Sequence, residues 1–422
     1  MSISYYLPAD GIFITGKNSD GAEPEYRSIR LFPGLAAAEA SNAGGLRLGT
    51  PDRGFAMVLS CPPGKEGADA GVNERGVAIC AETVRSRFRD SSRRIAPSAL
   101  VQAALVSSSS AEDARDKIVA LVEGSGRTAA SAQADDCDDG SYLITGPDGA
   151  FSLESAGSRW AWKSLDAAKS ISTAYVLGTD YKRLDPATRK AIAPVNERMA
   201  CLDEADAGRI AEKESWKRYV EPRWTSLKKE GEASVLAADT LLAATLEANA
   251  GRQAAFAVLR SHGTPDPRRT RKTVDLCRHP GAFGRRTTIG SFLVERSTVT
   301  DRFLVWFTGS AYPCANLFKP ILFDGAFEAL WEDYNYSPEE SPLGEQGSGS
   351  YSERRREAAR ALRRRPETAE GHAARLAASQ ALLGEIADSL LAGTGKASPD
   401  ELARARSQVA GIVAAWDAIA IL

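Results

Sequence analysis

Ser2 is the residue of this sequence that could supply a nucleophile and a base from one position. Its small side chain is compatible with removal of the initiator methionine, which would leave Ser2 with a free α-amine. A serine hydroxyl needs a base in order to attack a carbonyl, and an α-amine titrates near pH ~8. An N-terminal serine can therefore react without a histidine. Serine is also a common second residue with no catalytic role, so Ser2 alone identifies no activity.

Lys17 and Asp20 are the charged residues of the segment Gly16–Asp20, which directly follows a short apolar run, Gly11–Gly16. A lysine beside a nucleophile lowers its pKa or binds a substrate carboxylate, and an aspartate can hold an ammonium by a charge-assisted hydrogen bond. The same residues would also suit a polar turn with a solvated ion pair. Lys17 and Asp20 can take part in catalysis only if the fold places this segment beside Ser2.

The overall charge excludes two classes of partner. Fifty-three Lys and Arg against 55 Asp and Glu leave a net charge of −2 over 422 residues. A balance of this kind provides no attraction to nucleic acid or to an anionic membrane, so we expect neither as a partner.

Cysteine and histidine spacing argues against metal chemistry. The three histidines are His262, His279 and His372, and none lies within helical reach of another. No two of the six cysteines are closer than 19 residues, which excludes a local zinc knuckle, a CxxC pair and a compact disulfide framework. We therefore expect no metal, no cofactor and free thiols.

The ends of the sequence carry no targeting signal that we recognise. The N-terminal residues include neither a basic region nor an apolar one, and the apolar run Val409–Leu422 is too short to span a bilayer. We expect a cytoplasmic protein.

The pattern of apolar runs predicts an α+β fold rather than alternating βαβ units. Strands in hairpin-like groups are expected at 11–16, 55–60, 76–80, 141–145, 150–155, 288–295 and 301–308, and helices at 98–124, 189–213 and 233–246. We expect a catalytic domain over residues 1–336 with a helical insertion near 182–260, a connecting loop at 337–352 and a C-terminal helical region at 353–422.

Several sequence blocks follow one another in a fixed order: Gly16–Asp20, Met57–Ser60, Gly67–Ile79, Leu153–Gly157, Cys277–Pro280, Thr287–Ser291, Trp306–Gly309 and Phe318–Pro320. In order and spacing they resemble the secernin and dipeptidase branch of the N-terminal-nucleophile hydrolases. The resemblance implies a four-layer αββα sandwich of two antiparallel sheets, here followed by a C-terminal helical extension. It also implies hydrolysis of amide bonds in dipeptides or small N-acyl compounds through an acyl-enzyme.

The resemblance assigns roles to particular residues. Ser2 stands at the position of the nucleophile, beside Lys17 and Asp20, and Arg278 falls in a segment expected to face the pocket; Asn73 or Thr173 is expected to bind the developing oxyanion. Apart from the resemblance, Glu82 and His279 are candidate substrate contacts, and His279 equally suits a structural histidine. Glu82 and Glu154 are also candidate buried partners of Lys17 or Arg278, or members of a structural ion pair. We expect a small peptide or N-acyl substrate and leave homo-oligomer formation open.

The chain departs from the family pattern at three places. Serine replaces the usual N-terminal cysteine, and Ala81 and Thr173 stand where relatives carry asparagine. Loss of one oxyanion donor typically costs ~100- to 1000-fold in rate. Two alternatives therefore accompany the hydrolase: an inactive member with a binding or assembly role, and an acyltransferase on the same scaffold.

Overall fold

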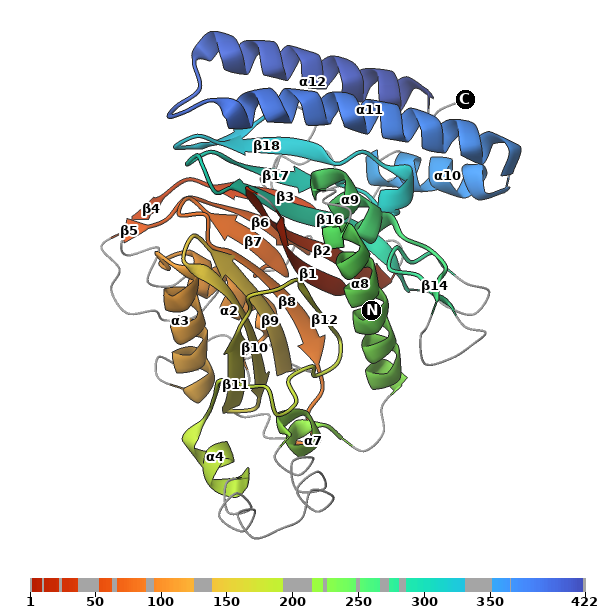
Figure 1. Ribbon diagram of the computed structural model, residues 1–422. Coiled ribbons are helices and arrows are strands. Elements are labelled where there is room, and N and C mark those ends of the chain that lie inside the picture. Colours follow the sequence, from red (N-terminus) through yellow and green to blue (C-terminus); the bar gives the residue numbers. More distant parts are fainter. Residues whose placement is uncertain are drawn as a thin grey trace.

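Two antiparallel β-sheets lie face to face at the centre of the molecule (Figure 1). The computed structural model describes residues 2–9, 11–22, 25–36, 53–62, 67–88, 95–124, 139–192, 215–222, 226–247, 251–265, 273–280, 286–330, 351–364 and 366–419.

The first sheet has seven strands, and the N-terminal segment supplies a hairpin next to one of its edges. In spatial order the strands are β12 (Lys169–Ser172), β1 (Ile3–Ala9), β2 (Ile12–Ala22), β16 (Arg286–Ser297), β17 (Phe303–Phe307), β18 (Lys319–Phe323) and β19 (Phe327–Ala329). Gly11 closes the turn between β1 and β2 at a φ of 74°, a backbone conformation that glycine adopts without strain.

The second sheet has eight strands and is a series of hairpins for most of its width. Its spatial order is β13 (Arg183–Leu184), β11 (Arg159–Ser164), β10 (Gly149–Ala156), β9 (Asp139–Gly146), β8 (Ala78–Val84), β7 (Ala70–Asn73), β6 (Met57–Cys61) and β3 (Ser28–Phe32). Two-stranded ladders complete the described strands: β4 (Leu35–Ala36) with β5 (Arg53–Gly54), and β14 (Thr264–Pro265) with β15 (Thr273–Val274).

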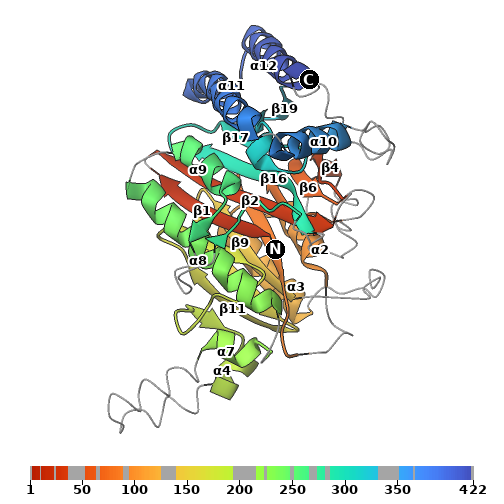
Figure 2. The ribbon, with the colours of Figure 1, turned by 90° about the vertical axis from the view of Figure 1, so that its right-hand side faces the viewer.

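Helices cover the outer face of each sheet. On the seven-stranded sheet, α8 (Ser226–Glu247) packs on β12 and β1, and α9 (Gly251–Arg260) packs on β2 (Figure 2). On the eight-stranded sheet, α2 (Pro97–Leu105) packs on β7 and β8, and α3 (Ala111–Glu123) packs on β9 and β10. The layers therefore run helix, sheet, sheet, helix, which confirms the predicted αββα sandwich.

Three helices form the C-terminal region that the sequence predicts. They are α10 (Tyr351–Arg364), α11 (Pro366–Ala392) and α12 (Pro399–Ile419), and α11 packs on β17 and β18 (Figure 1). Arg302 fastens them to the sheet: its buried guanidinium donates to the carbonyls of Leu390 and Gly395 and to the carboxylate of Glu401. In the described part of the chain no helix is long and apolar enough to cross a membrane.

Two expectations change in detail. The single helix predicted over 98–124 is two helices, because Ser108 bonds back to the Ala104 carbonyl and Ser110 caps α3 by accepting the amide of Asp113. In the segment expected to be an insertion, α8 and α9 supply one layer of the sandwich, and α4 (Pro186–Ile192) and α7 (Trp216–Val220) lie before them. Residues 193–214 and 337–350 lie outside the described residues.

Glu154 on β10 is a buried carboxylate that ties the second sheet to a neighbouring loop. Its Oε1 accepts the amide of Val176 at 2.6 Å, and the amide of Leu177 also points at the carboxylate. Burial raises the pKa of the Glu154 carboxyl to about 7. The expectation that Glu154 pairs with Lys17 or Arg278 is therefore wrong, because backbone amides bind this carboxylate.

The raised pKa predicts a pH-dependent stability. Since the folded protein holds this proton more tightly than an unfolded chain with a pKa of 4.5, the contribution is fully present below pH 4.5 and lost as the pH rises through about 7. We expect a loss of up to ~3 kcal/mol over that window, absent in Glu154→Gln. Urea unfolding at a series of pH values measures it, with the exposed Glu112→Gln as control. Equal pH slopes in wild type and Glu154→Gln would contradict the prediction.

Candidate active site

Ser2 directly precedes β1, whose neighbours in the sheet are β2 and β12. The register pairs Ile3 with Asn18 of β2 on one side and with Ser172 of β12 on the other. The Ser2 hydroxyl oxygen accepts the backbone amide of Asp20 at 3.0 Å, and the Ser172 hydroxyl donates to the Ser2 carbonyl at 2.6 Å. Hydrogen bonds from both neighbours therefore fix the position of this serine.

Asp20 is held on its other side by a relay of hydrogen bonds. The Thr288 hydroxyl on β16 donates to Asp20 Oδ1 at 2.7 Å and itself accepts the amide of Arg278 at 2.8 Å. Thr288 pairs directly with Asp20, and the register shifts by one residue immediately afterwards, at Ile289. The bulge interrupts the ladder at this point, which continues with Gly290 opposite Ser19. Bulges are frequent beside functional sites.

Thr173 follows Ser172, one residue beyond the end of β12. Its Oγ1 is buried and has no hydrogen-bond partner among the described residues. The backbone of α8 approaches closely here, since a Cβ on Gly231 would lie 2.9 Å from the carbonyl carbon of Thr173. A buried hydroxyl without a partner is costly, which makes Thr173 an unusual neighbour of the segment that contacts Ser2.

Lys17, Glu82 and Ser4 form a buried cluster between the two sheets. Lys17 Nζ lies 2.6 Å from Glu82 Oε1 and donates to the Ala81 carbonyl at 2.9 Å, while the Ser4 hydroxyl donates to the same Glu82 oxygen at 2.5 Å. Lys17 and Glu82 are each 1% exposed. Glu82 is therefore a partner of Lys17, one of the two pairings expected for it.

Lys17 stays protonated at neutral pH. Burial alone would lower the pKa of Lys17, but the carboxylates of Glu82 and Asp69 outweigh it and raise that pKa. Burial raises the pKa of Glu82, and the contacts with Lys17 and Ser4 oppose that rise. A lysine held in this way is a fixed positive charge and not a general base.

The sequence reading missed Asp69 and Arg27, which extend the cluster along β2. Asp69 Oδ2 accepts the Ser19 hydroxyl at 2.6 Å and Arg27 Nε at 2.8 Å. Burial would raise the pKa of Asp69, but Arg27 and Lys17 hold it below its usual value. Asp69 lies inside one of the blocks that carry the family resemblance. No motif or spacing in the sequence, however, singles out Asp69 or Arg27 as a site residue.

Asn73 lies elsewhere. Its amide nitrogen donates to the carbonyls of Leu105 and Ser108 at the end of α2, and its oxygen accepts the amides of Arg75 and Val77. The side chain thus faces the helix layer behind the second sheet, away from the space between the sheets. The structure does not bring Asn73 to Ser2.

Arg278 and His279, two of the three residues expected at the substrate, differ in their surroundings. The Arg278 guanidinium is partly exposed and lies 3.4 Å from Glu230 Oε2, while its backbone belongs to the relay that reaches Asp20. The His279 ring stacks on Tyr312 and points Nε2 at Cys314 Sγ. Its neighbours are therefore sulfur atoms and rings.

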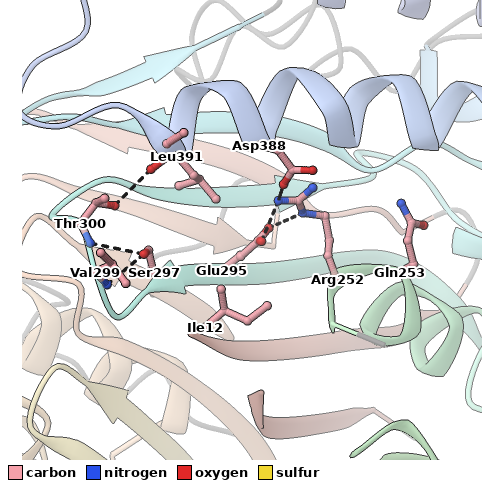
Figure 3. A pocket seen from close by; sticks show the side chains of 10 residues that line it. Ile12, Arg252, Gln253, Glu295, Ser297, Val299, Thr300, Asp388 and Leu391 are labelled. Atoms are coloured by element: carbon pink, nitrogen blue, oxygen red, sulfur yellow. Dashed lines mark hydrogen bonds and ion pairs between the residues drawn. The ribbon is translucent and has the colours of Figure 1, made fainter. Parts of the chain in front are cut away.

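A cavity of about 550 Å³ lies away from this group of residues (Figure 3). It opens at the opposite end of β2, beside Ile12, and is bordered by α9 and α11. Arg252 within it binds both oxygens of Glu295 and also Asp388. Because these charges satisfy one another, the cavity offers no free charged group for catalysis.

Comparisons with known proteins find a distant likeness to solved structures. No family model matches the chain. The chain is similar to penicillin V acylase from Agrobacterium tumefaciens, with 10% identity, a TM-score of 0.38, and 76% of this chain and 86% of that chain covered. Two variants of conjugated bile acid hydrolase from Clostridium perfringens match at 11% and 10% identity and TM-scores of 0.37 and 0.39, covering 76% and 77% of this chain and 96% and 98% of theirs. Likeness at these values does not decide what this chain does.

Asn73 provides a test of its structural placement. Asn73→Ala removes the two bonds that its amide donates to backbone carbonyls and the acceptor shared by two backbone amides. Each buried backbone group left unpaired costs ~1–3 kcal/mol. We therefore expect the free energy of unfolding to fall by at least ~3 kcal/mol. Asn73→Asp keeps the acceptor but turns a carboxylate oxygen toward the carbonyls of Leu105 and Ser108, so it should lose at least as much. Urea unfolding measures both, and a loss below ~1 kcal/mol for Asn73→Ala would contradict the placement.

Proposed function

We propose that the chain is an amide-bond hydrolase whose nucleophile is the hydroxyl of Ser2, acting from a free N-terminus. The observation that carries the proposal is the meeting of three separate segments at one strand end. Ser2 lies at hydrogen-bond distance from the amide of Asp20 and from the hydroxyl of Ser172, and Thr173 follows with a buried, unpartnered hydroxyl. These segments are the ones from which the sequence predicts nucleophile, positioning residue and oxyanion donor.

In the proposed reaction the Ser2 α-amine takes the proton of its own hydroxyl as Oγ attacks the substrate carbonyl. The Asp20 amide, already donating to Oγ, stabilises negative charge on that oxygen, and the Asp20 carboxylate orients the α-ammonium. Thr173 donates to the oxyanion of the tetrahedral intermediate. Collapse expels the amine, which takes the proton from the α-ammonium. Water, deprotonated by the α-amine, then attacks the acyl-enzyme carbonyl, and Ser2 Oγ leaves with the proton that the α-ammonium returns to it.

Lys17 acts through position and field rather than by proton transfer. Its ammonium and Ser4 both bind Glu82, and Ser4 lies two residues after the nucleophile on β1. The cluster therefore fixes the strand that carries Ser2. The partly exposed Arg278 guanidinium is suited to bind the carboxylate of a dipeptide or of a small N-acyl amino acid. A cytoplasmic setting remains part of the proposal.

A second candidate is a scaffold without catalysis. It is favoured by Ala81, whose side chain is buried with the residues of α2 and offers no donor where relatives of the resembling family carry asparagine. Of the two positions where relatives carry asparagine, only Thr173 would then keep a side-chain donor. Transfer of the acyl group to an amine in place of water is a variant of the first candidate.

Ser2 is tested by the state of the N-terminus and by substitution. We expect intact-mass measurement to show a chain that begins at Ser2, because a retained methionine would block the α-amine. Ser2→Ala should lower turnover of a panel of dipeptides and N-acyl amino acids by roughly 10⁴-fold or more. Ser28→Ala, a serine on β3, is the control.

Three outcomes separate the candidates. A retained Met1 sinks the mechanism, and unchanged turnover in Ser2→Ala moves the nucleophile elsewhere. If the wild-type protein shows no turnover but Ser2→Cys does, the site is otherwise complete. If both proteins are inactive, the result supports a scaffold without catalysis. Products formed with added amine identify acyl transfer.

Thr173 is tested by keeping or removing its hydroxyl. Thr173→Val should lower kcat by ~100- to 1000-fold, because it removes the expected oxyanion donor at nearly constant volume. Thr173→Ser retains the hydroxyl and should stay within ~10-fold of wild type. Steady-state kinetics on the best substrate measures both. Equal rates in wild type and Thr173→Val would remove Thr173 from the mechanism.

A further inference from the structure

Two cysteines and two histidines meet behind the Asp20 relay. The ligand atoms of His262, Cys277, His279 and Cys314 all lie within 4.8 Å of one another. His279 Nε2 is 3.7 Å from Cys277 Sγ and 3.1 Å from Cys314 Sγ, and the two histidine rings are 4.9 Å apart between centroids. The sequence spacing argued against a metal here, but it did not foresee this cluster, because three separate segments supply the four side chains.

These separations suit a single tetrahedral ion. With Zn–S of about 2.3 Å and Zn–N of about 2.0–2.1 Å, the ligand atoms around a tetrahedral zinc lie roughly 3.4–3.8 Å apart. The two His279–cysteine distances lie at or within a few tenths of an ångström of that range. Two thiolates and two imidazoles are also a common donor set of structural zinc sites.

Backbone contacts hold the three ligand segments together. The Ser261 carbonyl accepts the amides of Leu276 and Cys277, which binds the His262 segment to the Cys277 segment. Asn18 of β2 reinforces this junction by donating to the carbonyls of Leu259 and Leu276, both at 2.8 Å. The site is therefore built on the same strand that carries Lys17 and Asp20.

The Cys314 segment is held just as firmly. The Arg260 guanidinium donates to the carbonyls of Pro313 and Asn316, one on each side of Cys314. Tyr312, at a φ of 64°, is the one non-glycine residue with positive φ in the described part of the chain. Its ring stacks on His279 at 4.4 Å and 2°, which orients the imidazole toward the sulfur atoms.

We propose that Cys277, Cys314, His262 and His279 bind one Zn²⁺ ion in a closed, four-ligand structural site. Cys277 is buried and His262 exposed, so an ion can reach the ligands from the His262 side. The two ligands Cys277 and His279 flank Arg278, whose amide donates to Thr288 and through it reaches Asp20. The ion would thus fix the segment that supports Asp20, and the proposal does not depend on Ser2 being catalytic.

Metal content of the full-length protein, purified under reducing conditions, tests the site. We expect one zinc per chain by elemental analysis, and at least ~100-fold weaker zinc affinity in Cys277→Ser and in Cys314→Ser. Cys61→Ser, which removes a buried cysteine from the second sheet, should keep its zinc. Zinc retained at full occupancy in both Cys277→Ser and Cys314→Ser would overturn the assignment.

Wild type alone gives a second measurement, which does not depend on the variants folding. Zinc X-ray absorption should show two sulfur and two nitrogen ligands, and Co²⁺ exchanged into the site should give thiolate-to-cobalt charge-transfer bands. The proposal fails if wild type contains no zinc and binds no Co²⁺, if it holds iron instead, or if mass spectrometry finds a disulfide between Cys277 and Cys314 in the freshly purified protein. Turnover of substrates is not a readout, so loss of the proposed hydrolase activity would leave this result standing.

Discussion

The buried contact between Lys17 and Glu82 is the constraint on which the arrangement of the two sheets depends. A charge in this interior is tolerated only with a partner, and breaking such a pair by removing one member typically costs ~3–5 kcal/mol. Lys17 comes from β2 and Glu82 from β8, so the pair fixes one sheet over the other. Ser4 binds the same carboxylate and brings β1 into the arrangement, and Ser2 is placed two residues away as a result.

Asn18 plays the corresponding part on the opposite face of β2. Because side chains alternate along a strand, Lys17 points between the sheets and Asn18 points at the helix layer. There it collects two carbonyls, from the end of α9 and from the residue before Cys277. Adjacent residues of one strand therefore organise two different sites, the inter-sheet charge cluster and the cysteine–histidine cluster. The Ser2 hydroxyl meets the same strand at Asp20.

Local sequence patterns predicted the fold class but did not predict which side chains meet in the folded protein. Hairpin signals between residues 141 and 155 and the separate helical blocks predicted an α+β fold, and the family resemblance implied the αββα arrangement. The charges of the sequence also suggested Glu82 as a buried partner of Lys17 or Arg278. The break between α2 and α3 has a visible cause in Ser108 and Ser110, whose side chains bond to the backbone. The cysteine–histidine cluster has no local signal, because its ligands lie at positions 262, 277, 279 and 314 and only packing brings them together. Asp69 and Arg27 were missed for the same reason.

The seven-stranded sheet places Ser2 and the C-terminal helices near its opposite margins. Ser2 lies beside β12, which forms one margin of the sheet, whereas the C-terminal helices rest on β17 and β18 near the other margin. Arg302 anchors those helices to their own side through Leu390, Gly395 and Glu401. A protein or label attached to the outer surface of α12 would accordingly sit across the width of a sheet from the serine. A change on the outer surface of α12 is therefore expected to leave the surroundings of Ser2 unaltered.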